Sequence, residues 1–507
     1  MKSIILKLTG LKLIASITGL FYYILQVRIF GATAEVDAFF VAISAVYMIS
    51  SLVQSGQLSE VLLPEYLKQK RKFGDRGAHD LLSVILNRMV VFITPILIIL
   101  YFFSPFIISI IGPGLDPNIQ ALSADILSLS LIIVILTVIS AFINTTLNAE
   151  QIFGRAETTG IINGVISISI LLFFHEQFQI FTLVYALIAG KFMEFVIGLV
   201  FLKRIGYSYR FIWNLPDFNL LKFFRLMITT SGYVGATQLY SVVLTAMATF
   251  LPAGTFSIYN YVMQLSGKAS GIIMGPVSTV FFSKFSKLAS EGKKNLVNYL
   301  EKPLIGLLLF TFVIFCFILL SGHEILHILW SKRSLTDNEF LIAYLMLCLN
   351  FFGFIFNANG SIFRKTAVAM GYAKPLYKMW IGVQIFSAFY AFVSIYFLGT
   401  VGLASIIVVN MVLMASASFI MSQRSGINAI PIYRKLAESK NFGTFLISVL
   451  ISTLVMMYFF TYMDISMIPS LVIKMATLGI VVIGLGYALF PMLIKRVIPK
   501  LIPALQK

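Results

Sequence analysis

Long runs of apolar residues, each followed by a short polar segment, recur along the whole chain. A membrane-crossing helix needs about 20 consecutive, mostly apolar residues, and most of these runs reach that length. The pattern predicts fourteen transmembrane helices, at 9–30, 37–63, 81–111, 119–143, 158–174, 180–202, 226–251, 256–283, 303–330, 340–363, 375–398, 401–421, 442–463 and 469–494. The third and ninth are long enough to be tilted or broken, as Ser104-Pro105 and Ser321-Gly322 inside them suggest.

Composition agrees with a multi-pass membrane protein. Apolar residues make up 59% of the 507 residues and charged residues only 11%, whereas soluble chains average about 25% charged residues. The formal net charge is +18, but the basic residues lie between apolar runs rather than on one folded surface, so we expect no nucleic-acid partner. No loop is long enough to form a separate catalytic domain.

The basic residues also predict the orientation in the membrane. Most of the 38 lysines and arginines lie in the termini and in alternate loops, and the opposite loops hold only Lys332 and Arg333. Positive residues are retained on the cytoplasmic side, so both termini are predicted to be cytoplasmic. The basic and apolar start runs on to Phe30 without a small-residue cleavage site, which favours a first helix over a signal peptide.

An internal repeat suggests a duplicated architecture. IFGATAEVDAFFVAISAV at 29–46 is similar to TFLPAGTFSIYNYVMQL at 249–265: a helix ends in a small-residue turn, and Asp37 or Ser257 opens the next helix before aromatic residues. The spacing predicts two lobes of six helices around a central cavity, at 1–222 and 223–424. Residues 425–507 then add a helix pair and a basic tail.

The opening residues carry a family resemblance. QVRIFGATAEVDAFFVAISAV at 26–46, followed by SGQLSEVLLPEYLKQ from Ser55, resembles the start of the MurJ/MviN-type lipid flippases of the multidrug/oligosaccharidyl-lipid/polysaccharide exporter superfamily. The motif positions include Gly31, Asp37, Gly56 and Pro64. This resemblance implies a groove for lipid tails and the movement of an undecaprenyl-linked sugar to the outer leaflet by alternating access.

The chain departs from the family at positions that bear on cargo. The peptidoglycan-precursor flippases carry arginines facing the cavity, which hold a diphosphate through charge-assisted hydrogen bonds. The aligned residues here are Ser16, Tyr22, Ser50 and Gln264, and none is cationic. We therefore expect a surface-glycan or exopolysaccharide precursor as cargo ahead of lipid II, the peptidoglycan precursor.

Candidate cavity residues lie on the first, second and eighth helices. Lys268 is a cation deep in the eighth helix and is expected to contact phosphate, although a lysine that extends toward the membrane surface is an equal interpretation. Arg28 is expected either to touch a headgroup or to pair with Glu35 or Asp37. The other candidates are polar and uncharged, as sugar recognition requires: Tyr22, Gln26, Ser50, Gln54, Asn260 and Gln264.

Further residues are predicted to act in gating or structure. Gly31, Asp37, Gly56 and Pro64 belong to the family motif, and Lys191 and Glu194 are spaced to form an ion pair on the sixth helix. The seventh, eleventh and twelfth helices contain no carboxylate, which argues against a sodium site there. The membrane potential, worth about 2.3 kcal/mol per charge per 100 mV, is the simpler driving force.

Catalysis and metal binding are not expected. His79, His175, His323 and His327 lie in loops or near helix ends, no paired acids accompany them, and Cys316 and Cys348 lie in apolar runs. These features disfavour a membrane-bound transferase and predict no cofactor. The favoured hypothesis is a flippase of the bacterial inner membrane, in contact with membrane lipids and with a glycan polymerase or glycosyltransferase partner. The alternatives are a drug exporter of the MATE type and a non-transporting scaffold of a glycan-assembly complex.

Overall fold

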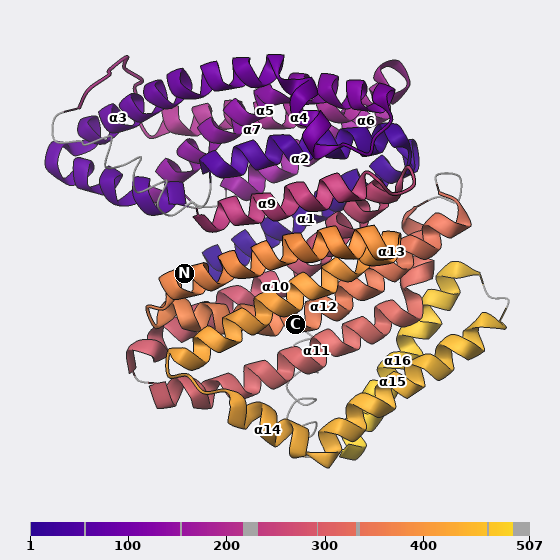
Figure 1. Cartoon of the computed structure of the whole chain (residues 1–507). Helices are drawn as coiled ribbons and strands as arrows, with labels where there is room; N and C mark the ends of the chain where they lie inside the picture. Colours follow the sequence, from indigo (N-terminus) through magenta and orange to yellow (C-terminus); the bar gives the residue numbers. More distant parts are fainter. Residues whose placement is uncertain are drawn as a thin grey trace. The chain divides into compact units, whose positions relative to one another are not determined.

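The computed structural model describes residues 2–54, 57–152, 155–215, 232–291, 293–330, 335–463 and 466–489, and its regular secondary structure there is entirely helical (Figure 1). The helices are α1 (Lys2–Phe30), α2 (Ala34–Gln54), α3 (Gln57–Phe102), α4 (Ser104–Ile111), α5 (Pro117–Ala149), α6 (Arg155–Phe178), α7 (Phe181–Arg204), α9 (Gly232–Ala248), α10 (Thr255–Glu291), α11 (Lys293–Leu329), α12 (Asp337–Ala369), α13 (Ala373–Arg424), α14 (Ile430–Glu438), α15 (Lys440–Thr461) and α16 (Met467–Leu489). Eleven of the described helices are long and apolar enough to cross a membrane. The predicted all-helical membrane fold is confirmed.

Two of these helices, α3 and α13, are interrupted at a glycine, so each contributes to more than one of the predicted segments. Gly399 interrupts α13 with a φ of 56° and a ψ of −128°. The Tyr390 hydroxyl lies 3.1 Å from the Ser405 hydroxyl although fifteen residues separate them, so the chain reverses at Gly399. The two arms of α13 are the predicted segments 375–398 and 401–421. Gly74, with a φ of 69°, likewise interrupts the helical backbone of α3.

The two long segments that were expected to be tilted or broken behave differently in the structure. The third segment breaks at Phe103, as its Ser104-Pro105 suggested; α4 begins at Ser104 with Pro105 in its first turn, since proline cannot supply the hydrogen bond of a helix interior. The ninth is unbroken, since α11 continues through Ser321-Gly322, and Gly322 gives the ring of Tyr344 room to pack.

The chain divides into two compact units. The first contains Met1–Pro276 and Gln384–Ile406. In it, α2 packs along α5, and the Ser123 hydroxyl donates to the Ala38 carbonyl at 2.9 Å. Glycines lie at two helix contacts, where Gly164 meets Thr18 of α1 and Gly190 meets Asn163 of α6. Small residues of this kind let membrane helices approach closely.

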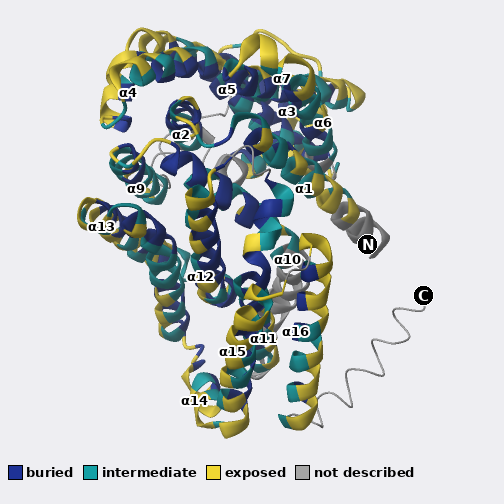
Figure 2. Ribbon diagram, turned by 90° about the vertical axis from the view of Figure 1, so that its right-hand side faces the viewer, coloured by how far each residue is buried: buried dark blue, intermediate teal, exposed yellow. Residues whose placement is uncertain are grey.

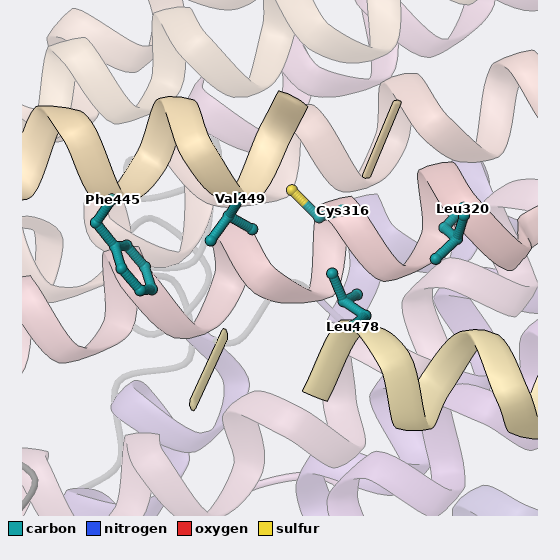
Figure 3. Close-up of a cluster of buried hydrophobic side chains, with 5 residues drawn as sticks. All are labelled: Cys316, Leu320, Phe445, Val449 and Leu478. Carbon is teal, nitrogen blue, oxygen red and sulfur yellow. The ribbon is translucent and has the colours of Figure 1, made fainter. Parts of the chain in front are cut away.

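The second unit contains Val277–Val383 and Ile407–Lys507. Its helix α12 is buried along much of its length, whereas α16 is largely exposed (Figure 2). Cys316 and Leu320 of α11 pack with Phe445 and Val449 of α15 and with Leu478 of α16 in one apolar cluster (Figure 3). This cluster attaches the terminal helix pair to α11. The lobe boundary predicted at 222–223 lies outside the described residues, and the predicted lobes stay a prediction.

Candidate functional site

Two glycine turns face each other in the first unit. Gly31 ends α1 with a φ of 62°, and Gly254 precedes α10 with a φ of 84°. Only glycine adopts such backbone angles without a steric cost. A Cβ added at Gly254 would overlap the carbonyl of Ala32, so the second turn also needs glycine in order to sit against the first. These are the turns of the predicted internal repeat, brought into direct contact.

Asp37 connects the two turns. Its carboxylate accepts from the Gly254 backbone N–H at 2.6 Å and from the Ser257 backbone N–H at 2.7 Å, and the Ser257 hydroxyl also donates to it, at 2.5 Å. The side chain is buried, and it meets the first turn of α10. The first N–H groups of a helix lack internal partners and carry partial positive charge, so a carboxylate is a favourable partner for them. Asp37 thus caps a helix that begins more than 200 residues further along the chain.

Neighbouring contacts extend this junction. The Tyr261 hydroxyl donates to the Gly31 carbonyl at 2.9 Å, and its ring meets the edge of Phe40. The backbone N–H of Gly114, in the turn between α4 and α5, donates to the Thr249 hydroxyl at 3.0 Å. A side chain at Gly114 would clash with the backbone of Thr249. The ends of α1, α4, α9 and α10 are therefore held together by contacts that leave little space.

The junction predicts the effect of one substitution. Both Gly254→Ala and Gly206→Ala place alanine at a positive φ, which costs about 1–2 kcal/mol, but Gly206 has open space around it. Gly254→Ala is therefore expected to lower the melting temperature of the purified protein further, because its Cβ also forces the two turns apart. Thermal unfolding followed by circular dichroism measures the difference. Equal losses for the two variants would contradict a close turn-to-turn contact.

A second set of polar residues lies on α1, α2 and α10, away from this junction. Four candidates from the sequence have buried polar atoms without a hydrogen-bond partner in the described protein: the Tyr22 hydroxyl, Gln26 Nε2, the Ser50 hydroxyl and Gln264 Oε1. Such atoms are rare because an unmet hydrogen bond in an apolar interior costs about 1–3 kcal/mol. All four lie in helices of a membrane protein, where the lipid offers no compensation.

Lys268 brings positive charge to the same helices. Its Nζ lies 5.8 Å from the centre of the Tyr23 ring and beside Gly19 of α1, where an added Cβ would be only 2.9 Å away. The lysine is half-buried, so its charge is partly withdrawn from solvent. A glycine on one helix thus makes room for a cation from another. Lys268 and the four unpartnered atoms are the part of the predicted cavity set that the structure places on neighbouring helices.

The remaining candidates occupy varied positions. Arg28 is exposed, and Asn260 donates to the Phe256 carbonyl of its own helix at 2.8 Å. Pro64 is exposed on α3, whereas Gly56 and the side chain of Gln54 lie outside the described residues. Their predicted roles stay predictions.

Lys191 and Glu194 form an ion pair of 2.9 Å on α7. The buried Arg155 lies beside them and donates to the Glu194 carbonyl at 3.0 Å and to the Asn144 amide oxygen at 2.6 Å. In the sequence, its basic side chain indicates only the orientation in the membrane. Gly198 on α7 leaves the space that the guanidinium occupies. The arrangement joins α5, α6 and α7, and the gating role of the Lys191–Glu194 pair stays a prediction.

Comparisons with known proteins point to one family. The family model described as lipid II flippase MurJ matches residues 26–492. A probable lipid II flippase MurJ of Buchnera aphidicola subsp. Acyrthosiphon pisum is 27% identical over 288 residues, which are 56% of this chain and 56% of that protein. A homologue with the same description, from Buchnera aphidicola subsp. Baizongia pistaciae, is 22% identical over 90% of this chain and 88% of its own length. The first of these alignments thus spans little more than half of the relative.

Solved structures share the fold. A lipid II flippase MurJ in an inward closed conformation matches with a TM-score of 0.80 and 18% identity, over 96% of this chain and 100% of that one. An inward-facing conformation of a multidrug resistance MATE family transporter of the MOP superfamily matches with a TM-score of 0.62 and 14% identity, over 84% of this chain and 99% of that one. Together with the many apolar helices, the family matches identify a multi-pass protein of the bacterial inner membrane.

Proposed function

Because this chain belongs to the MurJ lipid II flippase family, we propose that it carries a polyprenyl-diphosphate-linked glycan precursor from the cytoplasmic to the outer leaflet. The observation that carries the proposal is the group of unpartnered buried polar atoms on α1, α2 and α10. Sugar hydroxyls supply both donors and acceptors for such atoms. Lys268, on the same helices, supplies a charge-assisted bond to the diphosphate.

We assign the Asp37 junction to the outer gate. Both termini are cytoplasmic in the orientation that the basic loops favour, so the turn after α1 faces outward. With this gate closed, the polar cavity opens toward the cytoplasm and accepts the headgroup. Release to the outer leaflet requires the Gly254 and Ser257 N–H groups to leave the Asp37 carboxylate. These contacts therefore stabilise the state in which the outer gate is closed.

Two cargoes follow from different observations. The relatives are described as lipid II flippases, which supports lipid II. Ser16, Tyr22, Ser50 and Gln264 stand where the family resemblance implies arginines, which supports a different surface-glycan precursor with a diphosphate held mainly by Lys268. In either case, a glycan polymerase or glycosyltransferase on the outer side is the natural partner, because it consumes the delivered precursor.

Depletion of the protein in its own cell tests the function. Lipid-linked glycans are then extracted and identified by mass spectrometry, with an impermeant probe that reports the leaflet. The proposal predicts that one polyprenyl-diphosphate-linked glycan accumulates in the cytoplasmic leaflet. Lipid II would identify a peptidoglycan-precursor flippase, and another glycan would identify a specialised one. An unchanged leaflet distribution of all such lipids would overturn the proposal in favour of a drug exporter or a scaffold.

A further inference from the structure

A second group of titratable side chains lies in the other unit, at the end of α11. His323, Glu324 and His327 occupy its last two turns, and Lys474 of α16 meets them from the terminal helix pair. None of these residues belongs to the cavity helices or to the gate. A charge buried in a membrane segment is costly and is usually paired, so the arrangement of these four side chains needs a functional explanation.

Buried Lys474 and partly buried Glu324 form an ion pair. Lys474 is only 5% exposed; its ammonium donates to Glu324 Oε1, to the Leu320 carbonyl at 3.2 Å, and lies 5.3 Å from the centre of the Phe460 ring. Leu320 and Leu478, one turn from these charges, belong to the apolar cluster between α11, α15 and α16 (Figure 3). The pair is thus a polar contact in an otherwise apolar seam, and it fixes how α16 sits on α11.

The Glu324 carboxylate has a spare acceptor. Its Oε2 is buried and has no hydrogen-bond partner among the described residues. Lys474 therefore occupies only one of the two oxygens. A second cation next to Glu324 would satisfy the other oxygen and compete with Lys474 for the charge.

His323 and His327 are placed to supply that cation. Their Nε2 atoms lie 3.2 Å apart, a distance at which one imidazole donates its proton to the other. His327 is buried and stacks on Phe340 with ring centres 3.8 Å apart, whereas His323 is exposed. Residues three apart on a helix are surface neighbours, which puts His327 beside Glu324. A proton that arrives at exposed His323 thus reaches a site with a carboxylate next to it.

We propose that the His323–His327 pair is a proton-binding site whose counter-ion, Glu324, is shared with Lys474, so that proton uptake loosens the attachment of α16 to α11. The proton adds to an imidazole nitrogen and brings one positive charge. The carboxylate of Glu324 then pairs with the protonated imidazole through its spare oxygen, which weakens its ion pair with Lys474. Lys474 keeps its contacts with the Leu320 carbonyl and the Phe460 ring. No other co-reactant is required.

The other described groups near the pair do not duplicate this role. On α12, the Tyr344 hydroxyl donates to the Leu319 carbonyl at 2.6 Å, and Cys348 is buried further along the helix. In the first turn of α12, Glu339 is held by Thr336 in its capping interaction, and Asp337 is exposed. On α15, the described charged residue is Lys440, at the opposite end of the helix from Phe460, and Tyr458 is exposed. Among the described residues of these helices, Glu324 is therefore the carboxylate placed to balance the proton.

Nuclear magnetic resonance of ¹⁵N-histidine in the full-length protein, reconstituted in nanodiscs, tests the binding site directly. The chain has four histidines, so single substitutions to glutamine assign every signal. We expect His323 and His327 to change together in one titration, and His327→Gln to alter the His323 titration. At pH 6, Glu324→Gln should reduce the protonated fraction of the pair at least threefold, because the counter-ion is lost. Independent titration of both histidines, unaffected by Glu324→Gln, would overturn the proposal.

A distance measurement tests the loosening. Spin labels on the exposed positions Phe310 of α11 and Met475 of α16 report their separation by electron resonance. We expect a broader or longer distance at pH 5.5 than at pH 8 in the otherwise unchanged protein, and no pH effect in the His323→Gln/His327→Gln variant. His175→Gln is the matched control, since this histidine ends another helix, and it should keep the pH effect. Distances that do not respond to pH would refute the shared counter-ion. Neither readout depends on which cargo is carried.

Discussion

Asp37→Ala is expected to abolish most transport while leaving the helices inserted. The substitution removes an acceptor that holds two N–H groups and one hydroxyl of the α9–α10 turn and α10. Hydrogen bonds to a charged group are worth about 1.5–3 kcal/mol each. The three bonds together exceed about 3 kcal/mol, and a loss of only about 3 kcal/mol already shifts the balance between closed and open gate by roughly 100-fold. Asp37→Asn keeps one acceptor oxygen and should lose less.

Reconstituted transport assays, at equal amounts of folded protein, measure this effect. Glu35→Gln is the matched control because Glu35 lies in the same first turn of α2 but is exposed. It should transport at the rate of the unchanged protein. Asp37→Ala that transports as fast as Glu35→Gln would show that the junction is not a gate.

Lys268→Gln is expected to reduce transport by about 10- to 100-fold. That range corresponds to one charge-assisted hydrogen bond of about 1.5–3 kcal/mol, lost where the diphosphate binds. Glutamine removes the charge and keeps a polar side chain that is one bond shorter, so insertion and folding should be unaffected. Lys268→Arg, which keeps the charge, should retain more activity than Lys268→Gln.

Lys378→Gln controls for the loss of a positive charge as such, because Lys378 is exposed near the start of α13. Initial transport rates and membrane-inserted amounts are measured for all three variants. If Lys268→Gln and Lys378→Gln have the same small effect, Lys268 is a lysine that extends toward the membrane surface and takes no part in cargo binding.

The sequence predicted the membrane helices well because long apolar runs are a direct physical requirement for crossing a bilayer. It also predicted the separate segments 375–398 and 401–421 on either side of the reversal at Gly399. It did not predict that α11 extends ten residues before its apolar run begins. Polar helix extensions outside the membrane have no hydropathy signal. The turn residues Gly31 and Gly254 were visible as a repeat, but their contact was not.

The sequence predicted several residues of the candidate site but not how these residues contact one another. Asp37 was selected from the motif, yet its partners Gly254 and Ser257 lie more than 200 residues away, and no local pattern indicates which backbone N–H groups a carboxylate will meet. Gly114 and Arg155 were missed as structural residues for the same reason, since their partners Thr249 and Glu194 lie on distant segments. The unpartnered atoms of Tyr22, Gln26, Ser50 and Gln264 become visible only when burial is known.

Transport by the purified protein tests the central claim most directly. The full chain is reconstituted in vesicles that contain either lipid II or another polyprenyl-diphosphate-linked glycan in one leaflet, and an impermeant enzyme or lectin measures its arrival in the other. The account predicts movement of one of these lipids that requires the protein, persists in Glu35→Gln and is lost in Asp37→Ala and Lys268→Gln. Folded protein that moves neither lipid faster than protein-free vesicles would contradict it.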